Sequence, residues 1–219
     1  MRYIEVEQKY ELPSSSALIT ALTARGATPT APIRQIDAYY NHPARDFLAP
    51  TVISEWLRIR TEDRGSSLNY KLWHPVDTTT KSHADEYETT VGDAEALRHL
   101  VEALGFTSLV TVDKTRTTWR LPEVEVALDH LAGWGDFVEF EFKGEAKDVN
   151  EATTRLEKAI ADLGVELGPQ VHRGYPHILL GRDHRQRTQP APRDGTFTRS
   201  EETSERTRHS ALLPRSTTC

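Results

Sequence analysis

Charged and apolar residues alternate along much of the chain, and this alternation predicts short β-strands. In residues 4–12, Ile4 and Val6 fall in one phase, whereas Glu5 and Glu7 fall in the other. Successive side chains of a strand point to opposite faces of a sheet, so each such stretch would have one apolar and one charged face. The same alternation predicts seven further strands, at residues 34–41, 54–63, 66–74, 84–91, 111–121, 123–131 and 136–144.

Three other segments have apolar residues at the spacing of an amphipathic helix. Each segment begins with a candidate N-cap and ends at a glycine. The first segment has serines 14–16 and Gly26, the second has Asp93 and Gly105, and the third has Asn150 and Gly164. Leucine stripes of this kind are far more often core contacts than cofactor contacts. We therefore predict three packing helices, within residues 14–27, 93–106 and 150–165.

Together these elements predict an α+β fold, in which a closed eight-stranded antiparallel β-barrel has packing helices on its outside. A chain of 219 residues is long enough for one such domain, which we place at residues 1–181. From Arg182 onward the composition changes to Arg, Ser, Thr and Pro with no apolar stripe. Such a composition cannot bury enough apolar surface to fold, so residues 182–219 are predicted to form a disordered tail.

Composition narrows the class of protein. The formal net charge is −6, which does not favour a nucleic-acid-binding surface. The one cysteine is Cys219, which excludes an intramolecular disulfide and a cysteine-based metal cluster and fits a reducing cytoplasm. A run of about 18 consecutive apolar residues, as a membrane-spanning helix needs, is absent from the sequence. We therefore expect a cytoplasmic protein that binds neither nucleic acid nor membrane. The sequence does not determine the oligomeric state, and a homodimer is one of the open alternatives.

The charged faces of the predicted strands are sorted by sign. Pairs of glutamates occupy the opening strand and the strand near residue 140, whereas Arg58 and Arg60 share one phase of a middle strand. For any single strand, a charged face turned to solvent is the more common arrangement. Sorting by sign suggests instead a polar lumen, in which each poorly compensated ion would cost several kcal/mol unless the lumen were wet or occupied.

The two kinds of charge suit the two parts of one ligand. Carboxylates suit Mg²⁺ or Mn²⁺, which prefer oxygen ligands, and arginines and lysines suit phosphate oxygens. The glycine-rich phosphate loops GxxxxGK[ST] and GxGxxG are absent from the sequence, so a backbone cradle is not expected. The pattern therefore indicates a metal–polyphosphate site built from side chains.

Several motifs, taken in order, resemble those of a known family. The stretch IEVEQK resembles the ExExK signature of the CYTH superfamily, the triphosphate tunnel metalloenzymes that include class IV adenylate cyclases, thiamine triphosphatases and inorganic tripolyphosphatases. It is followed by EWLRIR, LNYK, EYE, VDKTR and LDHLAGWGDFVEFE, and the resemblance extends over about residues 1–181. The stretches YYNHPARDF and GYPHILL are most similar to the class IV adenylate cyclase branch. The resemblance implies that the barrel is a triphosphate tunnel.

The resemblance also implies a set of site residues. The implied ligands for Mg²⁺ or Mn²⁺ are Glu5, Glu7, Asp129, Glu139 and Glu141. The implied triphosphate-binding residues are Lys9, Arg58, Arg60, Lys71, Lys114, Arg116 and, as a looser match, Arg173. The residues assigned to catalysis are Lys9, Glu7 and Arg58. A supporting role, in orienting basic side chains or a second metal, falls to Glu86 and Glu88.

The activity implied by the resemblance is the metal-dependent processing of a triphosphate such as ATP, tripolyphosphate or thiamine triphosphate. The branch suggests the conversion of ATP to cyclic AMP and pyrophosphate. Hydrolysis of the terminal phosphate, by a tripolyphosphatase or a thiamine or nucleoside triphosphatase, is a close alternative, because the outcome depends on which nucleophile is aligned. A third alternative is a non-catalytic polyphosphate-binding domain. Such a domain would be expected to lack a carboxylate, yet all five implied metal ligands are present.

Some conspicuous residues have a structural interpretation. We interpret four tryptophans as packing residues rather than as platforms for a nucleobase, namely Trp56, Trp73, Trp119 and Trp134. Three further glutamates are expected outside the lumen or at its mouth, namely Glu11, Glu123 and Glu125.

Overall fold

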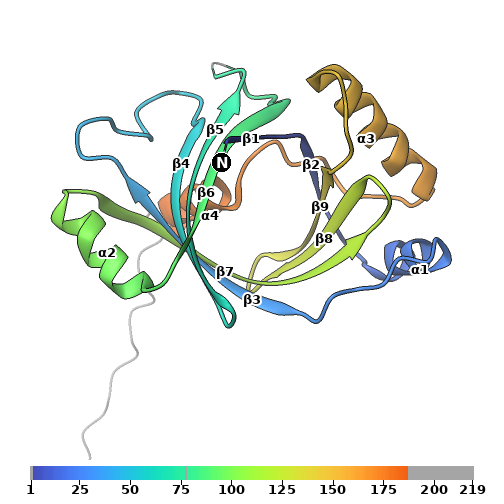
Figure 1. The fold of residues 1–219 in the computed structure, drawn as a ribbon, viewed down its shortest axis with the longest axis horizontal. Coiled ribbons are helices and arrows are strands. Elements are labelled where there is room, and N and C mark those ends of the chain that lie inside the picture. The colour runs from blue at the N-terminus through green and yellow to red at the C-terminus, as the bar shows by residue number, and fades with distance from the viewer. Residues whose placement is uncertain (1, 77, 187–219) are drawn as a thin grey trace, which may run out of the picture.

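The computed structural model describes residues 2–76 and 78–186, which form a curled antiparallel sheet with the first three helices on its outer side and the last helix within the curl (Figure 1). The strands are β1 (Arg2–Glu5), β2 (Glu7–Glu11), β3 (Ile33–Asn41), β4 (Glu55–Glu62), β5 (Gly65–His74), β6 (His83–Val91), β7 (Thr107–Arg120), β8 (Val124–Leu131) and β9 (Gly135–Phe142). The helices are α1 (Ser16–Ala24), α2 (Ala94–Ala103), α3 (Val149–Leu163) and α4 (Tyr175–Gln186).

All eight predicted strands are confirmed, and the opening one is divided in two. Neighbouring strands are antiparallel in the order β1-β6-β5-β4-β3-β7-β8-β9-β2. Only Val6 separates β1 from β2 in the chain, and its carbonyl oxygen accepts a hydrogen bond of 2.9 Å from the Phe142 amide. The opening stretch therefore pairs with β6 through its first half and with β9 through its second half, so it contacts both ends of the strand order.

The apolar faces of the strands lie outside, under the helices, as the alternation predicts. Leu18 and Leu22 of α1 and Leu156 of α3 share a buried cluster with Val126 of β8 and Phe140 of β9. A smaller cluster joins α2 to β4 and β3. Burial of a large aliphatic or aromatic side chain contributes about 1.5–3 kcal/mol, so these contacts hold the helices on the sheet and leave its charged face inward.

The three predicted helices are confirmed, with one change of cap. The Asp93 carboxylate accepts a hydrogen bond of 2.9 Å from the amide of Ala96 at the start of α2, as expected of an N-cap. At α3 the cap is Asp148, two residues before the expected Asn150, and its carboxylate accepts from the Glu151 amide at 2.8 Å. Gly164 ends α3 with φ of 65°, a left-handed conformation that glycine adopts without a steric cost.

Helix α4 was not predicted from the sequence. Its residues Ile178 and Leu179 pack with Trp56 and Val112, so it lies within the curl, against the inward face of the sheet (Figure 1). The helix continues past residue 181, and the predicted domain boundary therefore falls inside it. The rest of the predicted tail, residues 187–219, lies outside the described residues. None of the helices in the described ranges has the length and apolar character needed to cross a membrane.

Candidate functional site

The inward-facing charged side chains surround a cavity of about 320 Å³ within the curled sheet. The predicted site residues in its wall are Glu5, Glu7, Lys9, Arg58, Arg60, Lys71, Glu86, Glu88, Lys114, Arg116, Glu139 and Glu141. Two predicted residues are placed elsewhere. Asp129 is 1% exposed and lies beneath the wall, and Arg173 lines a neighbouring pocket. Glu125, expected outside the lumen or at its mouth, lines the cavity as well.

The strand order places the two signs in two sectors of the wall. Lining cations come from β5, β4 and β7, which with β3 form one continuous stretch of the sheet. Lining glutamates come from β8, β9, β2, β1 and β6, which form the other stretch. Three residues break this sorting. Lys9 on β2 and Lys143, directly after β9, lie in the acidic sector, and the buried Asp37 on β3 lies in the basic sector. Ion pairs therefore form within each sector as well as at their boundaries.

One boundary, between β5 and β6, has a cluster of carboxylates around a single ammonium. Lys71 is ion-paired with Glu5, and its Nζ lies 3.8 Å from Glu7 Oε2 and 3.9 Å from Glu86 Oε2. Burial raises the pKa of Glu7 to about 8 and also raises the pKa of Glu5, although Lys71 opposes both shifts. Burial raises the pKa of Glu141 as well, against the effect of its ion-pair partner Lys143 at 2.6 Å. The carboxylates outnumber the ammonium, so this cluster favours a further positive charge.

The donor chemistry of this cluster fits a hard divalent cation. Within the described residues, no group of three His, Cys, Asp or Glu side chains is already arranged around a metal position. Glu5 Oε2 is buried and ion-paired with Lys71, so a divalent cation bound here would share this oxygen with the ammonium. Carboxylate oxygens are the preferred ligands of Mg²⁺ and Mn²⁺. The residues at hand for such an ion are Glu5, Glu7, Glu86 and Glu141.

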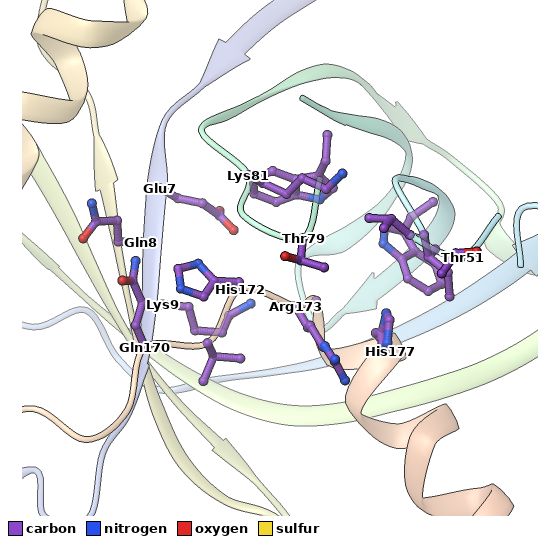
Figure 2. Close-up of a pocket in the computed structure, with 16 residues that line it drawn as sticks. Glu7, Gln8, Lys9, Thr51, Thr79, Lys81, Gln170, His172, Arg173 and His177 are labelled. Atoms are coloured by element: carbon purple, nitrogen blue, oxygen red, sulfur yellow. The ribbon is translucent and has the colours of Figure 1, made fainter. Parts of the chain in front are cut away.

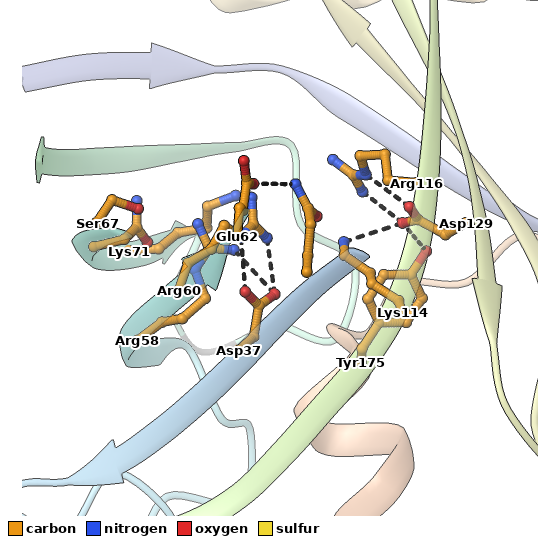
Figure 3. A network of polar contacts seen from close by, with 12 residues as sticks. Asp37, Arg58, Arg60, Glu62, Ser67, Lys71, Lys114, Arg116, Asp129 and Tyr175 are labelled. Carbon is orange, nitrogen blue, oxygen red and sulfur yellow. Dashed lines mark hydrogen bonds and ion pairs between the residues drawn. The ribbon is translucent and has the colours of Figure 1, made fainter. Parts of the chain in front are cut away.

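The other boundary, between β7 and β8, is a network in which the charges compensate one another (Figure 3). Arg116 donates from Nε to Asp129 Oδ1 at 2.6 Å, and it is also paired with Glu139. Lys114 Nζ lies 3.1 Å from Asp129 Oδ2, to which the Tyr175 hydroxyl donates at 2.8 Å. Burial alone would raise the pKa of Asp129, but Arg116 and Lys114 outweigh it and lower that pKa. The structure thus places Asp129 among cations, apart from the Glu5–Glu7 cluster.

Glu139, a second implied metal ligand, also lies in this network. Lys9 Nζ is 2.7 Å from its Oε1 atom. Burial would raise the pKa of Glu139, but Arg116, Lys9 and Lys114 hold it well below the usual range. Burial and the neighbouring Arg116 lower the pKa of Lys114 to about 8. Glu139 is therefore an ionised carboxylate that positions Lys9 and Arg116 in the wall.

Two arginines of β4 differ in how they are held (Figure 3). Arg60 donates from Nε and Nη2 to the two oxygens of Asp37, at 2.7 and 2.8 Å. Arg58 makes only long ion pairs, with Asp37 at 3.7 Å and with Glu88 at 3.9 Å, and its buried Nε has no hydrogen-bond partner among the described residues. Arg58 therefore has donor capacity to spare for an anion, whereas Arg60 is already committed to Asp37.

Asp37 was missed at the sequence level, although a signal was present. It falls in the same phase of its strand as Gln35 and Tyr39, opposite Ile36 and Ala38. The phase alone places Asp37 inside the lumen. Asp37 holds Arg60 because the two residues are direct partners in the register of β3 with β4. That register could not be predicted from the sequence.

A second pocket, of about 130 Å³, borders the cavity at the end where α4 begins (Figure 2). Arg173 and His177 line it, and Trp56 and Trp73 line both the pocket and the cavity. The packing interpretation is confirmed for Trp119 in the core and for Trp134, which packs against a buried cluster. The packing interpretation is only partly correct for Trp56. This side chain is 5% exposed and packs in a buried cluster, but it also borders the cavity and the second pocket. Trp73 borders the cavity and the second pocket as well.

Comparisons with known proteins agree with the resemblance. Residues 3–175 match the family model of the CYTH domain. A protein of Methanocaldococcus jannaschii named "Putative adenylate cyclase" is 30% identical over 155 residues, which cover 71% of this chain and 85% of that protein. A solved structure from Pyrococcus horikoshii is 28% identical with a TM-score of 0.66, covering 81% of this chain and 99% of the other. A protein from Hippeastrum described as a "putative adenylyl cyclase" with a dominant triphosphatase activity is 21% identical with a TM-score of 0.55, covering 84% and 96%.

Proposed function

Because the chain belongs to the CYTH family, we propose that it is a divalent-metal-dependent enzyme that processes a triphosphate inside the charged cavity. The observation that carries this proposal is the juxtaposition of two unsatisfied groups in one cavity. The Glu5–Glu7 cluster has more carboxylates than cations, and Arg58 makes only long ion pairs, at 3.7 and 3.9 Å. One side suits a metal ion and the other suits phosphate oxygens. A metal-bound triphosphate satisfies both.

The proposed site is a closed tunnel. The opening strand pairs with both β6 and β9, the first and last full-length strands of the order, which supports closure of the sheet around the cavity. A closed wall excludes water from the flanks of the substrate and strengthens the electrostatic interactions inside. The triphosphate would then lie along the lumen between the acidic and the basic sectors.

Each part of the wall has a proposed role. Glu5, Glu7 and Glu141 would hold the metal, which would supply positive charge beside the phosphate oxygens. Arg58, whose head group makes only long ion pairs with Asp37 and Glu88, binds the phosphate chain. Lys9, positioned by Glu139, stabilises the negative charge that develops on the leaving oxygen. Asp129 positions Lys114 and Arg116 rather than contacting the metal.

Two reactions fit this wall, and the aligned nucleophile decides between them. If a ribose 3′-hydroxyl attacks the α-phosphorus, ATP gives cyclic AMP and pyrophosphate. If water attacks the terminal phosphorus, the products are orthophosphate and a diphosphate. The name of the Methanocaldococcus relative supports the cyclase reaction, which we propose first. The triphosphatase activity described for the Hippeastrum protein supports hydrolysis as the second candidate.

The test is to incubate the purified protein with ATP, tripolyphosphate or thiamine triphosphate, with Mg²⁺ or Mn²⁺, and to separate the products by anion-exchange chromatography. Cyclic AMP and pyrophosphate from ATP would support the cyclase reaction. Orthophosphate without cyclic AMP would make the protein a triphosphatase. Activity that persists in EDTA would contradict the metal site. Binding of a triphosphate without turnover would instead support a non-catalytic polyphosphate-binding domain.

A further inference from the structure

Three glutamates form a row across the acidic sector of the cavity wall. Glu141 on β9 is the direct partner of Glu7 on β2 and of Glu125 on β8, and all three side chains line the cavity. Like charges that lie directly opposite each other on neighbouring strands destabilise a sheet. Glu141, the middle member of the row, therefore needs a cation close to it.

Lys143 supplies this cation. The residue comes directly after β9, its side chain lines the cavity, and its Nζ atom lies 2.6 Å from Oε1 of Glu141. The backbone at this point is held in place, because the Lys143 amide donates a hydrogen bond of 2.7 Å to the carbonyl oxygen of Glu123. Lys143 is thus a counter-ion of Glu141, one of the carboxylates proposed to hold the metal.

Lys143 differs from the other lysines of the cavity wall in its exposure to solvent. Its side chain is 41% exposed, whereas the side chains of Lys9, Lys71 and Lys114 are at most 15% exposed. A lysine carries its charge on a flexible four-carbon stem, so a partly exposed ammonium can change partners while the backbone stays in place. Solvent also screens such a pair, and its separation therefore costs less than that of a buried pair.

The two proposed ligands act on this ion pair in opposite ways. Glu141 is a proposed metal ligand, so a divalent cation and the Lys143 ammonium would compete for its carboxylate and would repel each other there. A triphosphate in the cavity would instead attract the ammonium, because Lys143 lines the same space and phosphate oxygens accept charge-assisted hydrogen bonds. Binding of both ligands therefore favours a shift of Lys143 from the carboxylate to the phosphates.

We propose that Lys143 is a displaceable counter-ion, which pairs with Glu141 in the metal-free protein and moves to the phosphate oxygens when metal and triphosphate bind. This assignment rests on the proposed function, because it describes how the same site exchanges one cation for another. It adds Lys143 to the substrate-binding residues, although the sequence motifs do not imply it. Loss of the ammonium should strengthen the binding of metal alone and weaken the binding of the triphosphate, and a purely structural residue would not give these opposite effects.

The experiment compares Lys143→Met, which keeps an apolar stem and removes the charge, with the same change at Lys158. Lys158 is exposed on α3, is paired with Asp162 and lies outside the cavity lining. Lys143→Arg keeps the positive charge, and Lys143→Gln repeats the test if Lys143→Met folds poorly by circular dichroism. Calorimetry measures the binding of Mn²⁺ alone and then, in saturating Mn²⁺, the binding of a tripolyphosphate analogue with imido bridges, which resists hydrolysis.

We expect Lys143→Met to bind Mn²⁺ alone about two- to five-fold more tightly than the wild type does, the range for loss of one partly exposed ion pair. Its affinity for the analogue should fall about ten-fold, through loss of one hydrogen bond between charged groups. Lys143→Arg and Lys158→Met should resemble the wild type in both measurements.

Two results would overturn the assignment and leave the proposed function standing. One is an Mn²⁺ affinity that is unchanged or lower in the uncharged Lys143 variants, and the other is an unaltered affinity for the analogue. If the wild type binds neither Mn²⁺ nor the analogue, the proposed function fails and the assignment of Lys143 fails with it.

Discussion

The two arginines of β4 show how one hydrogen bond can separate a binding residue from a structural one. Arg58 lines the cavity and makes only long ion pairs, at 3.7 Å with Asp37 and 3.9 Å with Glu88, so its replacement removes a donor to the phosphates and no close internal ion pair. We expect Arg58→Ala to weaken triphosphate binding by about 1.5–3 kcal/mol, the range for a hydrogen bond to a charged group. Calorimetry with tripolyphosphate and Mg²⁺ measures the change. Unaltered affinity would place Arg58 outside the binding site.

Asp37 is expected to act on stability, because it is 1% exposed and is the partner of both arginines. Asp37→Asn would leave Arg60 buried without its counter-charge, and we expect a loss of about 3 kcal/mol in the free energy of unfolding at pH 7. The exposed pair of Arg34 and Asp113 on neighbouring strands supplies the control. Asp113→Asn should cost much less, since solvent screens that pair.

The Asp37 effect should also depend on pH. Burial alone would raise the pKa of Asp37, but Arg58 and Arg60 outweigh it and lower the pKa in the folded state. A carboxylate with a lowered folded pKa contributes stability above its unfolded pKa, near 3.9, and this contribution is lost as pH falls toward the folded pKa. The difference between wild type and Asp37→Asn in urea unfolding should therefore shrink below about pH 4. A difference that stays constant down to pH 2.5 would contradict the assigned pairing.

Glu7 is expected to act on turnover and not on folding. Its raised pKa, about 8, means that the ionised carboxylate is disfavoured where it stands, so its loss costs the fold little. We expect Glu7→Ala to abolish metal-dependent turnover while the urea midpoint stays close to that of the wild type. Glu123→Ala is the matched control, because Glu123 is paired with Arg155 outside the cavity and its loss should leave turnover unchanged. Full activity of Glu7→Ala would remove it from the metal site.

Among the elements, α3 offers a clean test of a reassigned helix cap. The Asp148 carboxylate accepts the Glu151 amide at 2.8 Å, and the Glu151 side chain reaches back to the Lys147 amide at 3.0 Å. Asp148→Ala should lower the free energy of unfolding by about 1 kcal/mol through loss of this cap. Asn150→Ala, at the position expected from the sequence, should change it by less than about 0.5 kcal/mol. The reverse order of the two effects, measured by urea unfolding, would restore Asn150 as the cap.

Periodicity predicted the elements well wherever one face was apolar. The strands of the sheet were located because their alternation is strict, and α1, α2 and α3 because a stripe and a terminal glycine coincide. Helix α4 was missed because its apolar residues run together in Ile178, Leu179 and Leu180 without a clear stripe. Its position is set by contacts with Trp56 and Val112, which lie far away in the sequence.

The sequence predicted the candidate site only to the extent that the alternation along a strand tells which face of the sheet each side chain is on. Phase placed Glu5, Glu7 and Arg58 in the wall, but the pairing of Lys71 with Glu5 and of Arg60 with Asp37 depends on strand register. The second pocket, beside the cavity, could not be predicted for the same reason, since three segments distant in sequence line it. Sequence patterns thus predict which side chains face the lumen, and the fold decides which of them meet.

For the whole molecule, the internal ion pairs predict how metal and triphosphate bind together. Lys71 is paired with Glu5, and Lys9 with Glu139, so a triphosphate that takes these cations would leave buried carboxylates without partners. An uncompensated buried charge costs several kcal/mol. A metal ion that engages the carboxylates removes that cost, and by linkage the triphosphate raises the affinity for the metal equally.

We therefore expect Mg²⁺ and tripolyphosphate together to raise the melting temperature by more than the sum of their separate effects. Ligand at 100 times its dissociation constant adds about 2.7 kcal/mol to the free energy of unfolding, and that gain should appear only with both present. Differential scanning calorimetry of the four conditions, with free concentrations corrected for the Mg²⁺–tripolyphosphate complex, measures it. Glu7→Ala should abolish the excess while keeping the small response to tripolyphosphate alone. If tripolyphosphate in EDTA stabilises the wild type as much as the mixture does, the cations of the wall are free in the empty protein and the ion pairs do not link the two ligands.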